Sequence, residues 1–414
     1  MYLKGSKWSM RRHRRKRINF FRIFIVLGVI GAVLYVNQFV VPTIPPPFIS
    51  TTTPTRNPES FINQAAQMFR EGKLMQASKV YQDAIRTDPN NRSIYVSLAR
   101  VQIFAGQYED GLENAELALV GNDGYALAHG VRGWALQFLG RYDDALASLK
   151  RALELEPNNP LIQAYFAETL INKGDFGDMQ TAIQASREAI NLGPDLLESH
   201  RVRGYVLFVT GNYEDAIKEF QTALAINSNI PDLHMFMGYC YRAIGDYGNA
   251  IQSFLEANAL NPSDSVPDLE ISRTYATVGE FAKAVQAAQK AVEEDPENPH
   301  RYGNLGIMLY KNLEYDEAIN NLTIAVRGGT TLKGTTIAGL PLDYGLVAQY
   351  YYTYGLALAR QNRCNEAVSI MQALLAGVPD DEISVFNANE GLSMCKASLE
   401  AGTPTPEITV TPTP

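Results

Sequence analysis

The chain repeats a pattern of small, aromatic and proline residues about every thirty-four positions, and this repeat constrains the fold more than any other feature. One clear copy reads LHMFMGYCYRAIGDYGNAIQSFLEANALNP, and another reads VRGWALQFLGRYDDALASLKRALELEP. A period of this length is typical of stacked helical units, because each unit exposes an apolar face that only its neighbour covers. We therefore predict an all-α solenoid.

Each unit contains two apolar stretches with helical spacing, separated by a glycine and a polar residue. A glycine in the middle of a helix costs roughly 1 kcal/mol, so its recurrence needs a reason. We interpret these glycines as places where the partner helix approaches closely: Gly133, Gly204, Gly238 and Gly306. Proline ends many units and forces the turn to the next one: Pro89, Pro157, Pro194, Pro262, Pro296 and Pro379.

The units can be placed end to end within residues 58–400. We predict about nine repeats, at 58–91, 92–125, 126–159, 160–196, 197–230, 231–264, 265–298, 299–332 and 348–381. The fourth unit has three extra residues near 177–179, which indicate a longer turn, and Leu313 replaces the turn glycine of the eighth. We expect a hairpin or ordered loop at residues 328–347, which are rich in glycine and β-forming residues. We expect a helix at 382–400 that caps the last unit.

These motifs resemble the tetratricopeptide repeat (TPR) family over about four-fifths of the chain. The turn glycine and following aromatic residue appear as Gly106/Tyr108, Gly140/Tyr142, Gly174/Phe176, Gly211/Tyr213, Gly245/Tyr247 and Gly279/Phe281. The alanine four residues before a larger apolar residue appears as Ala77/Tyr81, Ala145/Leu149, Ala216/Phe220, Ala250/Phe254 and Ala318/Leu322. The resemblance implies a superhelix whose first helices line a concave surface that binds protein or peptide segments.

The N-terminal region predicts a membrane anchor. Residues 1–22 carry nine Lys or Arg and no acid, and they overlap an apolar stretch at 20–41 that is long enough to cross a bilayer. We divide this region into a basic cytoplasmic head (1–19), a transmembrane helix (20–41) and a Pro/Thr-rich linker (42–57). A disordered Thr/Pro tail is expected at 401–414.

The positive-inside rule places the N-terminus in the cytoplasm and the array on the other side of the cell membrane, in a single-pass topology. Two alternatives stay open: a secretory signal that is cleaved, and an array that lies in the cytoplasm. Beyond Arg22 the chain has 27 basic against 44 acidic residues. Such a balance argues against nucleic acid as a partner, because phosphates require a basic surface.

Cys364 begins the second helix of the last repeat, and Cys395 lies near the end of the predicted capping helix. The two helices should be antiparallel, with the cysteines at similar distances from the turn between them. This geometry predicts a disulfide if the location is oxidising; the alternative is a pair of partly buried thiols. For Cys240 we expect a small buried thiol.

No catalytic, cofactor or metal site emerges. The five histidines lie singly, and His129, His200 and His234 occupy near-equivalent repeat positions, which indicates packing. The segment GTTLKGTT has Thr335 where a phosphate-binding loop needs lysine. We therefore predict that the protein is not an enzyme.

Arginine and aromatic residues recur at and after the small position of the first helices, and these types are enriched at interfaces. The predicted partner-binding groove consists of Arg100, Phe104, Trp134, Phe138, Tyr205, Phe208, Tyr239, Arg242, Arg273 and Tyr310. Some of these residues could instead pack between units. The lysine and asparagine clamp with which chaperone-binding members hold a terminal carboxylate is not evident. The sequence predicts a membrane-anchored scaffold or adaptor; the alternative is a structural subunit of a cell-envelope export or cell-wall assembly complex.

Overall fold

The computed structural model describes residues 20–40, 57–331 and 334–402, which fall into two separate units. The first unit contains helix α1 (Phe20–Tyr35), which continues as a π-helix over Val36–Val40. The predicted basic head, most of the linker and the end of the Thr/Pro tail lie outside the described residues. The span Phe20–Phe39 has a mean hydropathy of 2.1 and is long and apolar enough to cross a membrane, a test that signal sequences also pass.

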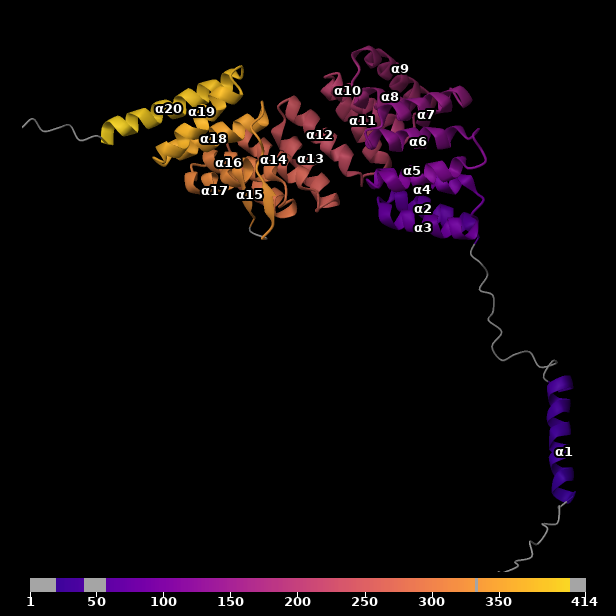
Figure 1. Cartoon of the computed structure of the whole chain (residues 1–414). Helices are drawn as coiled ribbons and strands as arrows, with labels where there is room; N and C mark the ends of the chain where they lie inside the picture. Colours follow the sequence, from indigo (N-terminus) through magenta and orange to yellow (C-terminus); the bar gives the residue numbers. More distant parts are fainter. Residues whose placement is uncertain (1–19, 41–56, 332–333, 403–414) are drawn as a thin grey trace, which may run out of the picture. The chain divides into compact units, whose positions relative to one another are not determined.

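The second unit is a helical solenoid of consecutive antiparallel pairs (Figure 1). The pairs are α2 (Pro58–Arg70) with α3 (Leu74–Thr87), α4 (Arg92–Phe104) with α5 (Tyr108–Leu119), α6 (Ala126–Phe138) with α7 (Tyr142–Leu155), α8 (Pro160–Lys173) with α9 (Met179–Leu192), α10 (Leu197–Val209) with α11 (Tyr213–Ile226), α12 (Pro231–Ala243) with α13 (Tyr247–Leu260), α14 (Ser265–Thr277) with α15 (Phe281–Glu294), α16 (Pro299–Lys311) with α17 (Tyr315–Arg327), and α18 (Leu346–Arg360) with α19 (Cys364–Gly377). The first eight pairs begin at the residues where the repeats were placed, and the ninth begins two residues earlier, at Leu346.

The turn inside most pairs depends on a residue in the left-handed backbone conformation. Glycine fills this position in most units, as Gly106 does with a φ of +75°, because it has no Cβ to strain. In the eighth unit Leu313 adopts the same conformation, with a φ of +67°. The backbone of the eighth turn is therefore strained, whereas the glycine turns are not. In the fourth unit the extra residues form a short 3₁₀ helix, Phe176–Asp178.

The mid-helix glycines allow the two helices of a pair to pack closely, as the sequence predicted. A Cβ placed on Gly238 would lie 2.4 Å from the ring of Phe254, and one on Gly204 would lie 2.6 Å from the ring of Phe220. Both rings are fully buried. The aromatic side chain of each second helix thus occupies the space that the glycine leaves empty.

The equivalent histidines fasten each unit to the turn before it. The Nε2 atoms of His129, His200 and His234 lie 2.9, 2.6 and 3.1 Å from the carbonyl oxygen six residues upstream. Tyr95 and Tyr302 occupy the same repeat position, and each donates its hydroxyl hydrogen to the corresponding carbonyl at 3.1 Å. The packing role predicted for these histidines is confirmed.

The array ends in a hairpin, a ninth pair and a capping helix. Strands β1 (Gly328–Thr330) and β2 (Thr336–Ala338) are antiparallel, with Gly329 opposite Ile337, and they pack on α17. Helix α20 (Glu382–Gly402) packs on α18 and α19 and ends two residues beyond the predicted boundary.

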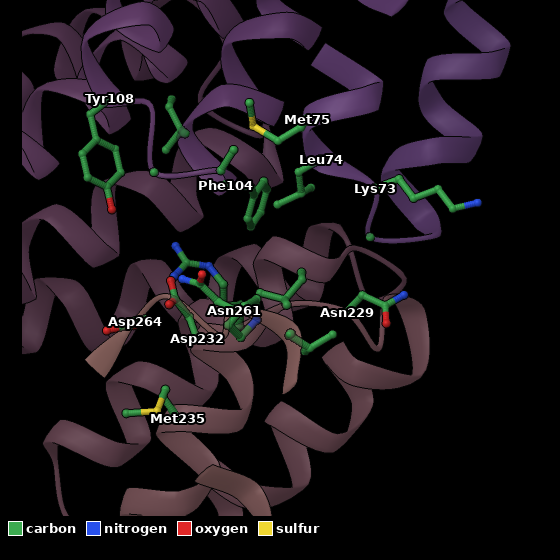
Figure 2. Close-up of a pocket in the computed structure, with 18 of the residues that line it drawn as sticks. Lys73, Leu74, Met75, Phe104, Tyr108, Asn229, Asp232, Met235, Asn261 and Asp264 are labelled. Atoms are coloured by element: carbon green, nitrogen blue, oxygen red, sulfur yellow. The ribbon is translucent and has the colours of Figure 1, made fainter. Parts of the chain in front are cut away.

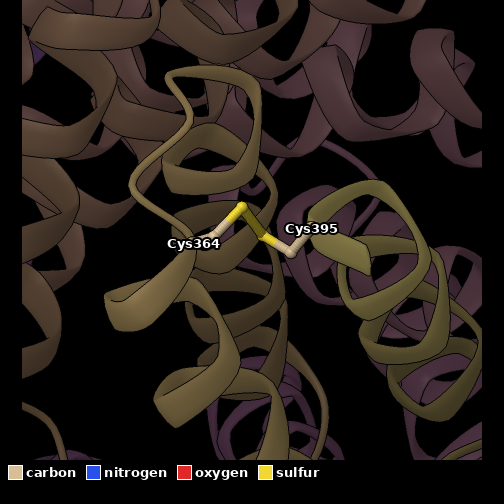
Figure 3. Close-up of a disulfide and its surroundings, with 2 residues drawn as sticks. All are labelled: Cys364 and Cys395. Atoms are coloured by element: carbon tan, nitrogen blue, oxygen red, sulfur yellow. A yellow bond between two sulfur atoms is a disulfide. The ribbon is translucent and has the colours of Figure 1, made fainter. Parts of the chain in front are cut away.

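A disulfide joins Cys364 to Cys395 across α19 and α20, with a Cα–Cα distance of 5.3 Å (Figure 3). The antiparallel hairpin therefore brings these two cysteines together in the way that the sequence indicated. Cys240 is a buried free cysteine, and burial raises the pKa of its thiol to about 12.

Candidate partner-binding site

The first helices of successive units contact one another directly, α4 with α6, α6 with α8 and α8 with α10. The ten predicted groove residues all lie on first helices, namely α4, α6, α10, α12, α14 and α16. Nine of these residues, all except Tyr310, fall into two groups that are held in different ways. The first group lies on α4 and α6, and the second lies on α10, α12 and α14.

The first group is organised around Arg201 of α10, which is 4% exposed. Its guanidinium pairs with Glu168 of α8 and lies over the rings of Phe104 and Trp134, 5.9 and 5.7 Å from their centroids. Trp134 donates its indole hydrogen to Glu168 at 2.9 Å and stacks on Tyr165. Trp134 is only 1% exposed, so it supports the concave surface from beneath.

A second ion pair crosses the inner side of the same turn. Arg100 of α4 pairs with Glu198 of α10, three units further along the chain, and the Glu198 side chain is 3% exposed. Burial alone lowers the pKa of Arg100, but Glu198 outweighs it and the pKa is raised. A buried charge without its partner would be strongly unfavourable, so these pairs hold α4, α8 and α10 in one arrangement.

The first unit also contacts the end of the fifth, through what we call the closure contact. Asn227 and Asn229, in the loop before α12, donate side-chain hydrogen bonds to the carbonyls of Phe69 and Glu71, both at 2.8 Å. Gly72 lies against Asn229 so closely that a Cβ on it would be 2.0 Å from the Asn229 Cβ. The first superhelical turn is thus closed on itself.

A pocket of about 560 Å³ lies beside the closure contact, and we call it the closure pocket (Figure 2). One wall comes from α3, α4 and their turns, with Leu74, Met75, Phe104 and Tyr108. The opposite wall comes from α12, the end of α13 and the start of α14. It contains Asp232, Met235, Asn261 and Asp264. Phe138, Trp134 and Arg201 also line the pocket. Phe138 stacks on Tyr108, with ring centroids 4.6 Å apart.

The second group is an aromatic cluster on α10 and α12. The ring centroids of Tyr205 and Phe208 are 6.5 Å apart, and those of Phe208 and Tyr239 are 6.2 Å apart. The ring of Phe236 contacts all three rings. Tyr205 donates its hydroxyl hydrogen to Asn172 at 2.7 Å. Burial raises the pKa of both Tyr205 and Tyr239 to about 12, so each hydroxyl stays protonated at neutral pH.

Two arginines extend this cluster toward α14. Glu270 accepts from both Arg242 and Arg273, the latter at 3.0 Å. The guanidinium of Arg242 also lies 5.5 Å from the centroid of Tyr239. Both arginine side chains are partly exposed to solvent, Arg242 by 30% and Arg273 by 35%. Tyr310 contacts Tyr315 of the second helix in its own unit and belongs to neither group.

Sequence reasoning named Phe104, Trp134 and Phe138, which line the closure pocket, but it missed the closure contact and the opposite wall with Asp232 and Asp264. Asp232 and Asp264 begin helices, where an acidic residue is common, and nothing local marks them as facing α3. Arg201 could have been noticed as a charged residue among apolar neighbours of a first helix. Its partners on α4, α6 and α8 follow only from the superhelical stacking.

The residues that the structure describes contain no group of three or more His, Cys, Asp or Glu side chains that could hold a metal ion.

Comparisons with known proteins agree with this architecture. Models described as tetratricopeptide repeat match residues 126–159, 201–265 and 269–327. Human tetratricopeptide repeat protein 28 is 31% identical over 98 residues, which is 24% of this chain and 4% of that protein. The wheat (Triticum aestivum) Hsp70-Hsp90 organizing protein is 25% identical over 133 residues, 31% of this chain and 23% of the relative. This chain thus matches less than a quarter of either relative.

A crystal structure of the APC/C hetero-tetramer Cut9-Hcn1 is similar in fold, with a TM-score of 0.57 and 14% identity. The match covers 80% of this chain and 55% of that one.

The fold and the inner surface define a helical-repeat protein of the protein-binding scaffold class. The chain contains tetratricopeptide repeats at the matched residues, and its N-terminal apolar helix is a candidate membrane anchor. Scaffolds of this family are generally not enzymes.

Proposed function

We propose that the protein is a membrane-anchored scaffold that binds protein or peptide segments on the concave side of the array. The observation that carries this proposal is the closure pocket, which has one wall with aromatic and aliphatic side chains and an opposite wall with polar and acidic ones. Concave, mostly apolar pockets with a few polar groups are the usual form of binding sites. The wheat relative is by its name an organizing protein for two other proteins, which supports the same role.

The anchor sets where this binding would occur. Helix α1 follows a basic head, so the positive-inside rule favours a cytoplasmic N-terminus with the array on the opposite side of the membrane. Protease added to intact cells should then degrade residues 58–400. Complete protection of the array in cells whose surface proteins are digested would place it in the cytoplasm instead. Intact-mass measurement of the mature protein distinguishes a retained anchor from a cleaved signal.

The aromatic and arginine cluster of α10 and α12 offers a direct test of concave binding. Alanine at Tyr205, Tyr239 and Arg242 together should remove captured partners, because these side chains supply the exposed cation and ring surfaces of the second group. A control with alanine at Leu117 and Val120 removes exposed apolar surface from α5 and the residue after it. If both variants capture the same partners as the parent chain, the groove assignment fails.

A structural subunit of an envelope complex is the second candidate function. The buried pairs Arg100–Glu198 and Arg201–Glu168 favour it, because they hold the first turn rigid from the inside. Co-purification of the full-length protein in one complex of fixed stoichiometry would support this role over transient recruitment.

We propose no catalytic activity, cofactor or nucleic-acid partner. The acidic balance beyond the basic head supports this proposal for nucleic acid. A filter-binding assay with duplex and single-stranded DNA that showed saturable binding would contradict it.

A further inference from the structure

The closure pocket has an unbalanced charge. It is lined by two cations, Lys73 and Arg201, and by two carboxylates, Asp232 and Asp264. Both cations are already neutralised, because Lys73 pairs with Glu71 at 2.7 Å and Arg201 pairs with Glu168. Within the described ranges, neither Asp232 nor Asp264 has a cationic group within 4 Å. Desolvation by the surrounding protein raises the pKa of Asp232 and the nearby charge of Arg201 lowers it, so Arg201 acts on both Glu168 and Asp232. With Glu71 and Glu168 counted, four carboxylates outnumber two cations in and beside the pocket, which leaves its charge negative.

Both carboxylates are available to a ligand. Asp232 is exposed and forms no hydrogen bond in the part of the chain that the structure describes. Asp264 caps α14 by accepting from the Val266 amide at 2.9 Å, which uses one lone pair of one oxygen and leaves the rest of the carboxylate free.

The wall opposite these carboxylates is apolar. Met75 is 62% exposed there, beside Leu74 and Phe104 (Figure 2). A large apolar side chain that is left so open at a pocket mouth has surface to bury against a ligand. One wall is thus complementary to an apolar group of a ligand, and the opposite wall is complementary to a cation.

We propose that the closure pocket binds a peptide segment of a partner protein that presents a large apolar side chain next to a lysine or arginine. The apolar side chain packs against Leu74, Met75 and Phe104, and the cation lies between Asp232 and Asp264. This assignment rests on the proposed scaffold function and adds the chemistry of the partner to it. The first unit meets the end of the fifth, and this contact brings residues of the first two units opposite residues of the sixth, so the site belongs to the closed turn and to no single repeat.

The test selects binders from a random dodecapeptide library displayed on phage, with the full-length protein in detergent as bait. Selected peptides should carry Lys or Arg beside an aromatic or aliphatic residue. Their synthetic versions should bind in fluorescence polarisation, more weakly as salt rises. Asp232→Asn combined with Asp264→Asn should weaken binding about tenfold, because two charge pairs are lost. Asparagine preserves the cap of α14, so this variant should fold normally.

Two controls separate the pocket charge from the overall charge. Asp195→Asn removes an exposed carboxylate that does not line the pocket and should leave binding unchanged. Met75→Lys should weaken binding. Val120→Lys, which adds the same charge at a residue that is 65% exposed and outside the pocket, should not.

Selected peptides that are acidic or uncharged, or basic ones that ignore the Asp232/Asp264 variant, would overturn the inference. If such peptides still lost binding in the Tyr205/Tyr239/Arg242 variant, the scaffold function would stand with a different partner chemistry. Failure to select any peptide would overturn the inference as well, and stable partners in a pulldown would then be needed to sustain the scaffold function.

Discussion

Replacing Gly72 with alanine should open the closure contact between the first and fifth units, and Gly106→Ala provides a matched control. Both glycines have left-handed backbones, with φ values of +71° and +75°. Alanine in this conformation costs roughly 1–2 kcal/mol, and both variants bear that cost. A Cβ on Gly106 meets nothing within 4 Å, whereas one on Gly72 would lie 2.0 Å from the Asn229 Cβ.

The additional cost at Gly72 can be worked from the contact itself. Asn229 must move away, and the hydrogen bonds from Asn229 and Asn227 to the carbonyls of Glu71 and Phe69 are then lost or weakened. A typical hydrogen bond contributes about 0.5–1.5 kcal/mol net, so the pair contributes about 1–3 kcal/mol. Gly72→Ala should therefore destabilise the closed turn by that amount beyond Gly106→Ala.

Hydrogen exchange read by mass spectrometry measures this difference locally, which suits an array that need not unfold in one step. Protection around residues 69–74 and 227–233 should fall roughly 5- to 150-fold more in Gly72→Ala than in Gly106→Ala. The closure pocket should lose peptide binding in the first variant only. Equal protection in the two variants would refute the reasoning, because the closure contact would then contribute nothing to the turn.

Three further predictions concern other parts of the array. Leu313→Gly should raise the free energy of unfolding by about 0.5–1 kcal/mol, because glycine adopts the left-handed backbone without strain and the lost side chain is 71% exposed. Leu313→Ala should give no such increase in a thermal melt. Burial and the nearby carboxyl of Asp268 raise the pKa of Glu294 to about 7. The protonated form is favoured in the folded state, so the melting temperature should fall as pH rises from about 4.5 through 7, and Glu294→Gln should flatten this fall. Serine at both Cys364 and Cys395 should destabilise the packing of α20 by about 2–4 kcal/mol. A reducing agent should speed hydrogen exchange of α20 in the parent protein but not in this variant. An equal effect in both proteins would show that this disulfide does not stabilise α20.

Much of the fold could be predicted from local pattern. The repeat spacing predicted where the first helix of each of the first eight units begins, because glycine turns and proline ends recur in the same register. The mid-helix glycines predicted close helix contacts, and the ring of Phe220 makes this contact at Gly204 and the ring of Phe254 at Gly238. His129 and its equivalents predicted packing because they recur at one repeat position, and their hydrogen bonds reach only six residues upstream. Each of these features depends on contacts within a unit or with the next one.

The candidate site could be predicted only in part. The sequence marked the right helices, since all ten groove residues lie on first helices, but it could not separate exposed residues from supporting ones. Trp134 and Tyr239 occupy the same repeat position, yet Trp134 is buried under Arg201 while Tyr239 keeps part of its surface. Part of the difference comes from Arg201, which is two units away from Trp134 and whose position no local pattern encodes.

The sequence by itself thus determined the class of fold, the length and order of the helices and the presence of an apolar N-terminal segment, because these follow from periodicity and composition. Tertiary structure decided that the first turn closes, that Arg100 meets Glu198, and that Asp232 faces Leu74 and Met75. Those outcomes depend on the small rotation between successive units. That rotation accumulates over several repeats until residues 158 positions apart come into hydrogen-bond contact.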